Sequence, residues 1–157
     1  MGLALLTGIL AATGCRSTPR IYRDDVAAEH VRTRIEAYYR DFSARDWNAF
    51  ASHFWPGATL TTVWQAEGAD RPGVVASSIP RFIEEAPLGP DSKPIFEERL
   101  RHLSLQVRGG IAFAWADYNA KFGEPGDMGY WSGVDAITLL RHEDQWKIVC
   151  ITFEGGG

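Results

Sequence analysis

The first part of the chain has apolar residues at the three- and four-residue spacing of an amphipathic helix. The positions that would share the buried face are Val31, Ile35, Tyr38, Tyr39 and Phe42. Asp24 or Asp25 can accept a hydrogen bond from a free backbone N–H and so cap this helix. The pattern therefore predicts a long helix that packs on one side only.

A second, shorter helix is predicted directly afterwards, with Asp46 as its cap. Its apolar side chains would be Trp47, Phe50 and Phe54. The Pro56-Gly57 pair would end it, because these two residues commonly mark turns.

A strand and a third helix are predicted next. Residues 58–64 (ATLTTVW) are rich in β-branched side chains, which favour a strand. Residues 65–75 predict a loop, and Ser77 or Ser78 can cap a short third helix.

The second half of the chain has the alternation and spacing of a strand meander. The four candidate strands are residues 95–107, 111–122, 130–141 and 146–153. Gly109-Gly110, residues 123–129 and the polar turn His142–Gln145 would connect them. Short connections suit antiparallel neighbours, so the whole pattern predicts an α+β fold.

Composition narrows the class of protein. The chain has 157 residues, 45% of them hydrophobic, which is enough for one domain with a buried core. Its net charge of -4 argues against nucleic acid as a partner. No spacing of His, Cys or acidic residues predicts a metal site, and no cofactor is expected. Cys150, within a predicted strand, is interpreted as a small hydrophobic residue rather than a nucleophile.

The N-terminus predicts export. Residues 1–14 are apolar and uncharged, as in the core of a signal peptide, and the sequence before Cys15 resembles a bacterial lipobox. That resemblance implies lipid on Cys15, a tether over residues 15–23 and a domain over residues 24–154. The protein would cross the inner membrane and stay anchored at the cell envelope, in the periplasm or on the outer membrane, with only its lipid in the membrane. A plain signal peptide or a misassigned start remains the alternative.

Two segments resemble the nuclear transport factor two-like superfamily, which includes SnoaL-like polyketide cyclases and ketosteroid isomerases. One is IEAYYRDFSARDWNAFASHFWPGATLTTVW (residues 35–64) and the other is VDAITLLRHEDQWKIVCITF (residues 134–153). The resemblance implies a cone-shaped fold in which N-terminal helices pack on a curved, mostly antiparallel sheet. It also implies a homodimer formed through the outer face of the sheet.

The same resemblance suggests catalytic candidates. Tyr38 falls at the catalytic Tyr of the ketosteroid isomerases, but Thr62 and Thr138 fall where those enzymes use Asp. Tyr38 would act as the acid, with Tyr118, Asp135 or His53 as the base. His53 could instead be an exposed residue at a helix end. Glu97-Glu98-Arg99 is interpreted as solvated charge.

Alternation sorts the strand residues into two faces. By the resemblance, the cavity face carries Ala112, Ala114, Ala116, Tyr118, Ala120, Val134, Ala136, Val149, Ile151 and Phe153. The outer, dimer-forming face would carry Phe113, Trp115, Trp131, Ile137, Leu139, Trp146 and Ile148. The reverse assignment remains open, as does a core in which helix side chains leave no cavity.

A cavity of this kind suits a small apolar ligand. The expected ligand-binding residues are Tyr38, Thr62, Trp64, Ala116, Tyr118, Thr138 and Ile151. Three functions stay open: a small-molecule-binding domain without catalysis, which is preferred; a SnoaL-like isomerase, cyclase or dehydratase acting on a small apolar substrate; and a structural homodimer module.

Overall fold

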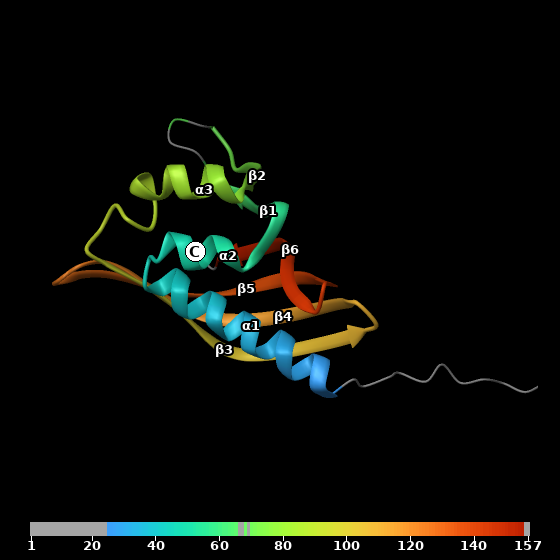
Figure 1. The fold of residues 1–157 in the computed structure, drawn as a ribbon. Helices are drawn as coiled ribbons and strands as arrows, with labels where there is room; N and C mark the ends of the chain where they lie inside the picture. The colour runs from blue at the N-terminus through green and yellow to red at the C-terminus, as the bar shows by residue number, and fades with distance from the viewer. Residues whose placement is uncertain (1–24, 66–67, 69, 156–157) are drawn as a thin grey trace, which may run out of the picture.

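A long helix lies across one face of a six-stranded sheet in the computed structural model, which describes residues 25–65, 68 and 70–155 (Figure 1). In chain order the elements are α1 (Asp25–Ser43), α2 (Trp47–Ser52), β1 (Phe54–Trp64), β2 (Gly73–Ser78), α3 (Ile79–Glu85), the 3-10 helix η1 (Ala86–Leu88), β3 (Ile95–Arg108), β4 (Ile111–Glu124), β5 (Asp127–His142) and β6 (Gln145–Gly155). The expected α+β class is confirmed.

The strands follow the order β2-β1-β6-β5-β4-β3 across the sheet. Every neighbouring pair is antiparallel except β1 and β6, which are parallel. All three α-helices lie on the same side of this sheet (Figure 1). One face of the sheet therefore forms the core with the helices, and the other is left without a second layer.

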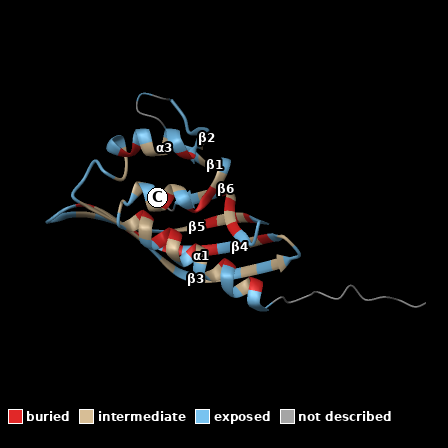
Figure 2. Ribbon diagram, in the orientation of Figure 1, coloured by how far each residue is buried: buried red, intermediate tan, exposed pale blue. Residues whose placement is uncertain are grey.

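The core forms where α1 meets the sheet. Val31 and Ile35 on α1 are fully buried, as are Ala112, Ala114 and Ala116 on β4. Figure 2 shows the buried positions on the face of α1 turned to the sheet and on the strands beneath it. Alanines on the sheet allow the helix to come close, so this half of the concave face is filled rather than hollow.

The four C-terminal strands agree with the prediction, and each of them is longer than expected. The connection expected over residues 123–129 is much shorter, because β4 and β5 stay paired as far as Glu124 and Asp127. The polar turn between β5 and β6 is also tight, and both of its central residues, Glu143 and Asp144, have positive φ angles of 48° and 59°. This is the geometry of a two-residue hairpin turn.

Two predictions in the N-terminal half are wrong. Phe54 and the Pro56-Gly57 pair belong to β1 rather than to the second helix, and the pairing of β1 with β6 shifts register between Phe54 and Thr59. Proline has no backbone N–H to donate, so a break in the ladder here is expected. The loop predicted up to residue 75 also overlaps β2, whose mostly exposed residues give no alternation to detect.

The face assignment is correct for β4 and wrong for β5. Directly paired residues share a face, and Ala116 pairs with Asp135. Asp135, Ile137 and Leu139 are therefore buried under the helices, whereas Val134, Ala136 and Thr138 are on the outer side. Apolar residues occur on both faces of residues 134–140 (VDAITLL), and this conceals the phase of the alternation.

A bulge changes the phase of β6. Thr138 pairs with Cys150, but the next residue, Leu139, pairs with Ile148, so Val149 is an extra residue. Ile148 and Ile151 are consequently both fully buried, and Trp146 is buried with them. Trp146 and Ile148 thus lie on the core face, contrary to the expected outer face.

The expected signal peptide, the lipidated Cys15 and the tether lie outside the described residues. Among the described residues, no helix is long and apolar enough to cross a membrane.

Candidate functional site

A cavity of about 380 Å³ lies between the helices and the far ends of the curved strands. More than half of the side chains that line it are aromatic. They are Tyr38, Phe42, Phe50, Trp64, Phe82, Phe96, Tyr118, Phe122, Trp131 and Phe153. They come from three helices and five strands, so the whole fold contributes to the cavity wall.

Polar groups in the lining are few, and those that ionise are carboxyl and phenol groups. The acidic residues are Glu85, Glu98 and Asp135, and no Lys, Arg or His is among the described residues that line the cavity. Glu85 is exposed at the rim and binds Arg81 at 2.9 Å. Glu98 and Asp135 are the two carboxyls without a cation.

Asp135 reaches the cavity from β5 and is only 3% exposed. The hydroxyl of Tyr39, on α1, donates a hydrogen bond of 2.5 Å to Oδ2. Burial raises the pKa of Asp135 to about 7, although the hydrogen bond from Tyr39 acts in the opposite direction. The carboxyl is therefore divided between its acid and its ionised form near neutral pH.

Glu98 reaches the cavity from β3. The prediction that this residue belongs to a solvated charged group is therefore wrong. Burial, and then the nearby carboxyl of Asp135, raise the pKa of Glu98 to about 8. Ser43, the last residue of α1, holds the Glu98 backbone: its hydroxyl accepts from the N–H at 2.8 Å and donates to the carbonyl at 2.7 Å. Its neighbour Glu97 points to the other face and pairs with Lys121 and Arg99.

The alternation of β3 carried a signal for Glu98. Phe96 and Leu100, two residues to either side of it, both pack against the core. A side chain between them on the same period-two face must point the same way. The glutamate was missed because it lies within a charged triplet.

Tyr118, on β4, lies between the carboxyls of Glu98 and Asp135. It is two residues from Ala120, which pairs with Glu98, and two residues from Ala116, which pairs with Asp135. Burial first, then Glu98 and Asp135, raise its pKa far above the ordinary value for tyrosine. Its hydroxyl therefore stays protonated.

Gly133 makes room for the ring of Tyr118. A Cβ atom built on Gly133 would come within 2.3 Å of both the ring carbon Cζ and the hydroxyl oxygen of Tyr118, and within 2.7 Å of the Glu154 carbonyl. Gly133 is also the residue paired with Tyr118 across the two strands. The tyrosine can lie across β5 only because this position has no side chain.

Tyr38 faces the carboxyls from α1. It is 4% exposed and is surrounded by rings, with Phe42 stacked on it and Phe54 edge-on. Among the described residues none hydrogen-bonds to its hydroxyl. Burial, Asp135, Glu98 and Tyr118 raise its pKa well above the ordinary value, so the hydroxyl is a neutral group that can donate or accept a hydrogen bond.

The predicted site residues are divided between the cavity and other places. Tyr38, Thr62, Trp64, Tyr118 and Asp135 line it. Ala116 and Ile151 do not, because they are fully buried in the packed core. Thr138 is on the outer side of β5 and also does not line the cavity, since the phase of that strand is opposite to the expected one.

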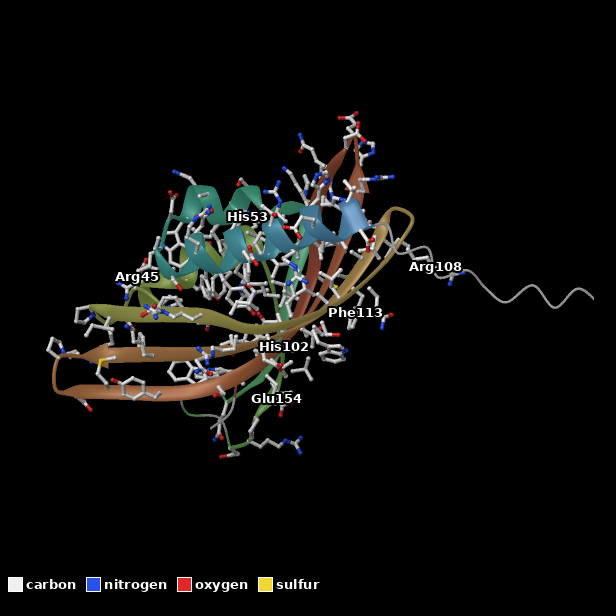
Figure 3. All side chains as sticks on the ribbon, turned by 90° about the horizontal axis from the view of Figure 1, so that it is seen from below. Arg45, His53, His102, Arg108, Phe113 and Glu154 are labelled. Carbon is white, nitrogen blue, oxygen red and sulfur yellow. The ribbon has the colours of Figure 1, made fainter. Side chains whose placement is uncertain are left out.

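His53 lies outside the cavity lining and is also not exposed. The guanidinium of Arg34 donates to Nδ1 at 3.1 Å, so Nε2 carries the proton that binds Asp41 at 2.8 Å. Burial is the main cause that lowers the pKa of His53. The histidine joins the end of α2 to α1, and Figure 3 shows it on the helix side of the sheet. Within the described part of the chain, no group of three or more His, Cys, Asp and Glu residues could hold a metal ion.

Solved structures with the same architecture identify the fold. A Mycobacterium tuberculosis protein of unknown function superposes with a TM-score of 0.67 at 14% identity, over 83% of this chain and 72% of that one. A candidate dehydratase of the NTF2-like family from Streptomyces avermitilis gives 0.64 at 16% identity, over 82% and 95%. A Salmonella enterica protein of the nuclear transport factor 2 (NTF2-like) superfamily gives 0.65 at 14% identity, over 85% and 93%.

The chain therefore has the NTF2-like fold, as its sequence resemblance implied. No protein-family model and no curated protein sequence matches it.

Proposed function

We propose that this domain binds a small, mainly apolar molecule in the cavity. The observation that carries the proposal is Tyr38, a residue only 4% exposed that lines an aromatic cavity of about 380 Å³ and whose hydroxyl has no hydrogen-bond partner among the described residues. Buried polar groups are normally paired, and a bound molecule would supply the missing partner. A cavity that is mostly apolar with a few polar groups is typical of small-molecule sites.

A cavity-filling substitution tests this proposal. Thr62 lines the cavity and its neighbour Thr61 does not, so Thr62→Trp and Thr61→Trp are a matched pair. Thermal shift against a panel of small aromatic compounds, with mass spectrometry of molecules that co-purify, would measure binding. We expect ligands that stabilise the wild type and Thr61→Trp but not Thr62→Trp. Equal stabilisation of all three proteins, or of none, would contradict the proposal.

The carboxyl of Asp135 favours a second candidate, acid–base catalysis of the isomerase or dehydratase type. A carboxyl whose pKa is near 7 can accept a proton from a bound substrate at neutral pH. Tyr38, across the cavity, would donate a hydrogen bond to an oxygen that becomes negative, and Tyr39 would hold the carboxyl in place. Among the structural neighbours, a Novosphingobium aromaticivorans protein is described as a candidate scytalone dehydratase, at 9% identity.

Proton exchange from an activated carbon tests the second candidate without knowledge of the substrate. β-Tetralone in deuterated buffer exchanges its acidic C–H protons, and NMR follows the rate. Catalysis by the wild type that Asp135→Asn loses and Asp117→Asn keeps would support acid–base chemistry, because Asp117 is exposed on the outer face. A rate equal to that of buffer alone would leave binding without catalysis as the function.

We also propose that lipid on Cys15 holds the domain at the cell envelope. The support is the lipobox-like sequence that ends at this cysteine. Labelled palmitate should enter the full-length protein and not its Cys15→Ser variant.

A further inference from the structure

The cavity has an imbalance of charge that the described residues do not correct. Glu98 and Asp135 contribute carboxyls, while Lys, Arg and His are all missing from its lining. Among the described residues, Tyr39 is the one side chain that hydrogen-bonds to Asp135, and none forms a hydrogen bond or ion pair with the carboxyl of Glu98. Ionised carboxyls without a cation are costly at such a site, where Asp135 is 3% exposed and Glu98 is half-buried.

The aromatic wall has the same electrostatic preference. The face of an aromatic ring is electron-rich and attracts cations, most strongly in Trp and Tyr. Trp64, Tyr38, Tyr118 and Trp131 all line the cavity. An anionic ligand would meet carboxyls and ring faces together and would find no compensating group.

We propose that the ligand of this cavity carries a positively charged nitrogen, an organic ammonium group attached to an apolar body. The ammonium would lie near Tyr118, between the carboxyls of Glu98 and Asp135, and would donate a hydrogen bond to the unpaired hydroxyl oxygen of Tyr38. The apolar body would pack against the rings of Phe42, Phe96 and Phe122. This inference rests on the proposed binding function and specifies the chemical class of its ligand.

Three probes that differ in one group test the charge preference. Naphthylmethylamine is cationic, naphthylmethanol is neutral and naphthoate is anionic, and all three share the same ring system. Isothermal titration calorimetry at pH 8 should give an affinity for the amine at least about tenfold higher than for the alcohol, and no measurable binding of naphthoate. The amine should also release a proton to the buffer, because its charge lowers the pKa of the two carboxyls, which burial and, for Glu98, the neighbouring Asp135 otherwise raise.

Removal of the carboxyl charges should remove the preference. In Glu98→Gln and in Asp135→Asn we expect the amine to lose about tenfold in affinity while the alcohol changes by less than about twofold. Glu97→Gln is the matched control, because this adjacent glutamate points to the other face and pairs with Lys121. Asp135→Asn changes the hydrogen bond of a buried tyrosine, Tyr39, and so can impair folding. Glu98→Gln changes no such bond among the described residues and keeps the test valid in that case.

The outcomes separate this inference from the function on which it rests. Binding of the alcohol as tight as that of the amine, or tight binding of naphthoate, would overturn the ammonium proposal and leave a ligand cavity. Absence of binding by all three probes, together with no stabilising ligand in the Thr62→Trp comparison, would overturn both. An amine preference that survives in Glu98→Gln and Asp135→Asn would show that other groups create it.

Discussion

The raised pKa values of Asp135 and Glu98 make the stability of the fold depend on pH. In the unfolded chain both carboxyls ionise near their ordinary pKa values, but in the folded protein burial raises the pKa values to about 7 and about 8. Between the ordinary pKa of a carboxyl and these raised values, the unfolded state has therefore lost protons that the folded state still holds. The cavity acids stabilise the fold at low pH, and this contribution is lost as the pH rises through 7 and 8.

The first prediction concerns this pH dependence. The double variant Asp135→Asn/Glu98→Gln should be more stable than the wild type, by an amount that grows from near zero at pH 4 to a few kcal/mol at pH 9. Urea unfolding at several pH values would measure the free energy of unfolding. The control Asp117→Asn/Glu97→Gln should not gain stability as the pH rises. A constant difference between the double variant and the wild type would contradict the assignment of raised pKa values.

The second prediction concerns the space above Gly133. Gly133→Ala should lower the free energy of unfolding by roughly 1–3 kcal/mol, because its methyl group would collide first with the ring of Tyr118 and then with the backbone carbonyl of Glu154. Chemical denaturation would measure the loss, and Gly110→Ala, where the nearest atom is 3.7 Å away, is the control. In a Tyr118→Leu background the cost of Gly133→Ala should be clearly smaller. Equal costs in both backgrounds would place the strain elsewhere.

The candidate site was only partly predictable from the sequence, for reasons that differ between residues. Tyr38 and Tyr118 were found because the family resemblance pointed to Tyr38 and assigned the alternating alanine face that carries Tyr118 to the cavity. Glu98 was missed because neighbouring charges obscured its alternation with Phe96. His53 was misjudged because its partners, Arg34 and Asp41, are one helix away, and the sequence does not show how two helices pack.

Among the secondary-structure elements, the β5–β6 hairpin shows best what local pattern can and cannot predict. Its two strands and its turn were predicted within a few residues, because turn residues and β-branched runs are local signals. The sequence did not predict which residues of β5 face the core, because the pairing of β5 with β4 decides this. The extra Val149 in β6 also depends on pairing, so no reading of one strand alone would place Ile148 and Ile151 on one face.

The third prediction concerns the turn of this hairpin. Asp144 has a φ angle of 59°, which costs a non-glycine residue roughly 1 kcal/mol, so Asp144→Gly should raise the free energy of unfolding by a similar amount. Thermal or urea denaturation would measure the gain. Gln145→Gly is the control: it lies next to the turn without a positive φ angle and should lose stability. A loss of stability in Asp144→Gly would contradict this prediction. It would show that the aspartate side chain stabilises the turn by more than the positive φ angle destabilises it.

At the level of the whole molecule, the two faces of the sheet have different environments. The concave face is covered by helices, whereas the outer face carries Phe113 and Trp115, whose rings are in edge-to-face contact at 5.3 Å. Trp115 is 51% exposed, and Figure 3 shows Phe113 on the side away from the helices. We propose that a second copy of this chain covers the outer face, because exposed aromatic groups on a sheet favour self-association.

The fourth prediction tests this assembly. Trp115→Glu should convert a dimer into a monomer, because a charge at the centre of an apolar interface loses its hydration without gaining a partner. Light scattering coupled to size-exclusion chromatography would measure the molar mass. Val26→Glu, at an exposed apolar position on α1, should stay dimeric. A monomeric wild type would refute the proposal directly.

The long helix divides the concave face into a tightly packed half and a hollow half, and this division affects how the protein can evolve. Substitutions under Val31 and Ile35 would be removed by selection, since both side chains are fully buried in close-packed surroundings. The rings and acids around the cavity have free space beside them, so many replacements would leave the chain folded. Homologous lineages could therefore exchange one bound molecule for another while the architecture stays unchanged. This freedom fits with neighbours that keep the fold at 9% to 16% identity.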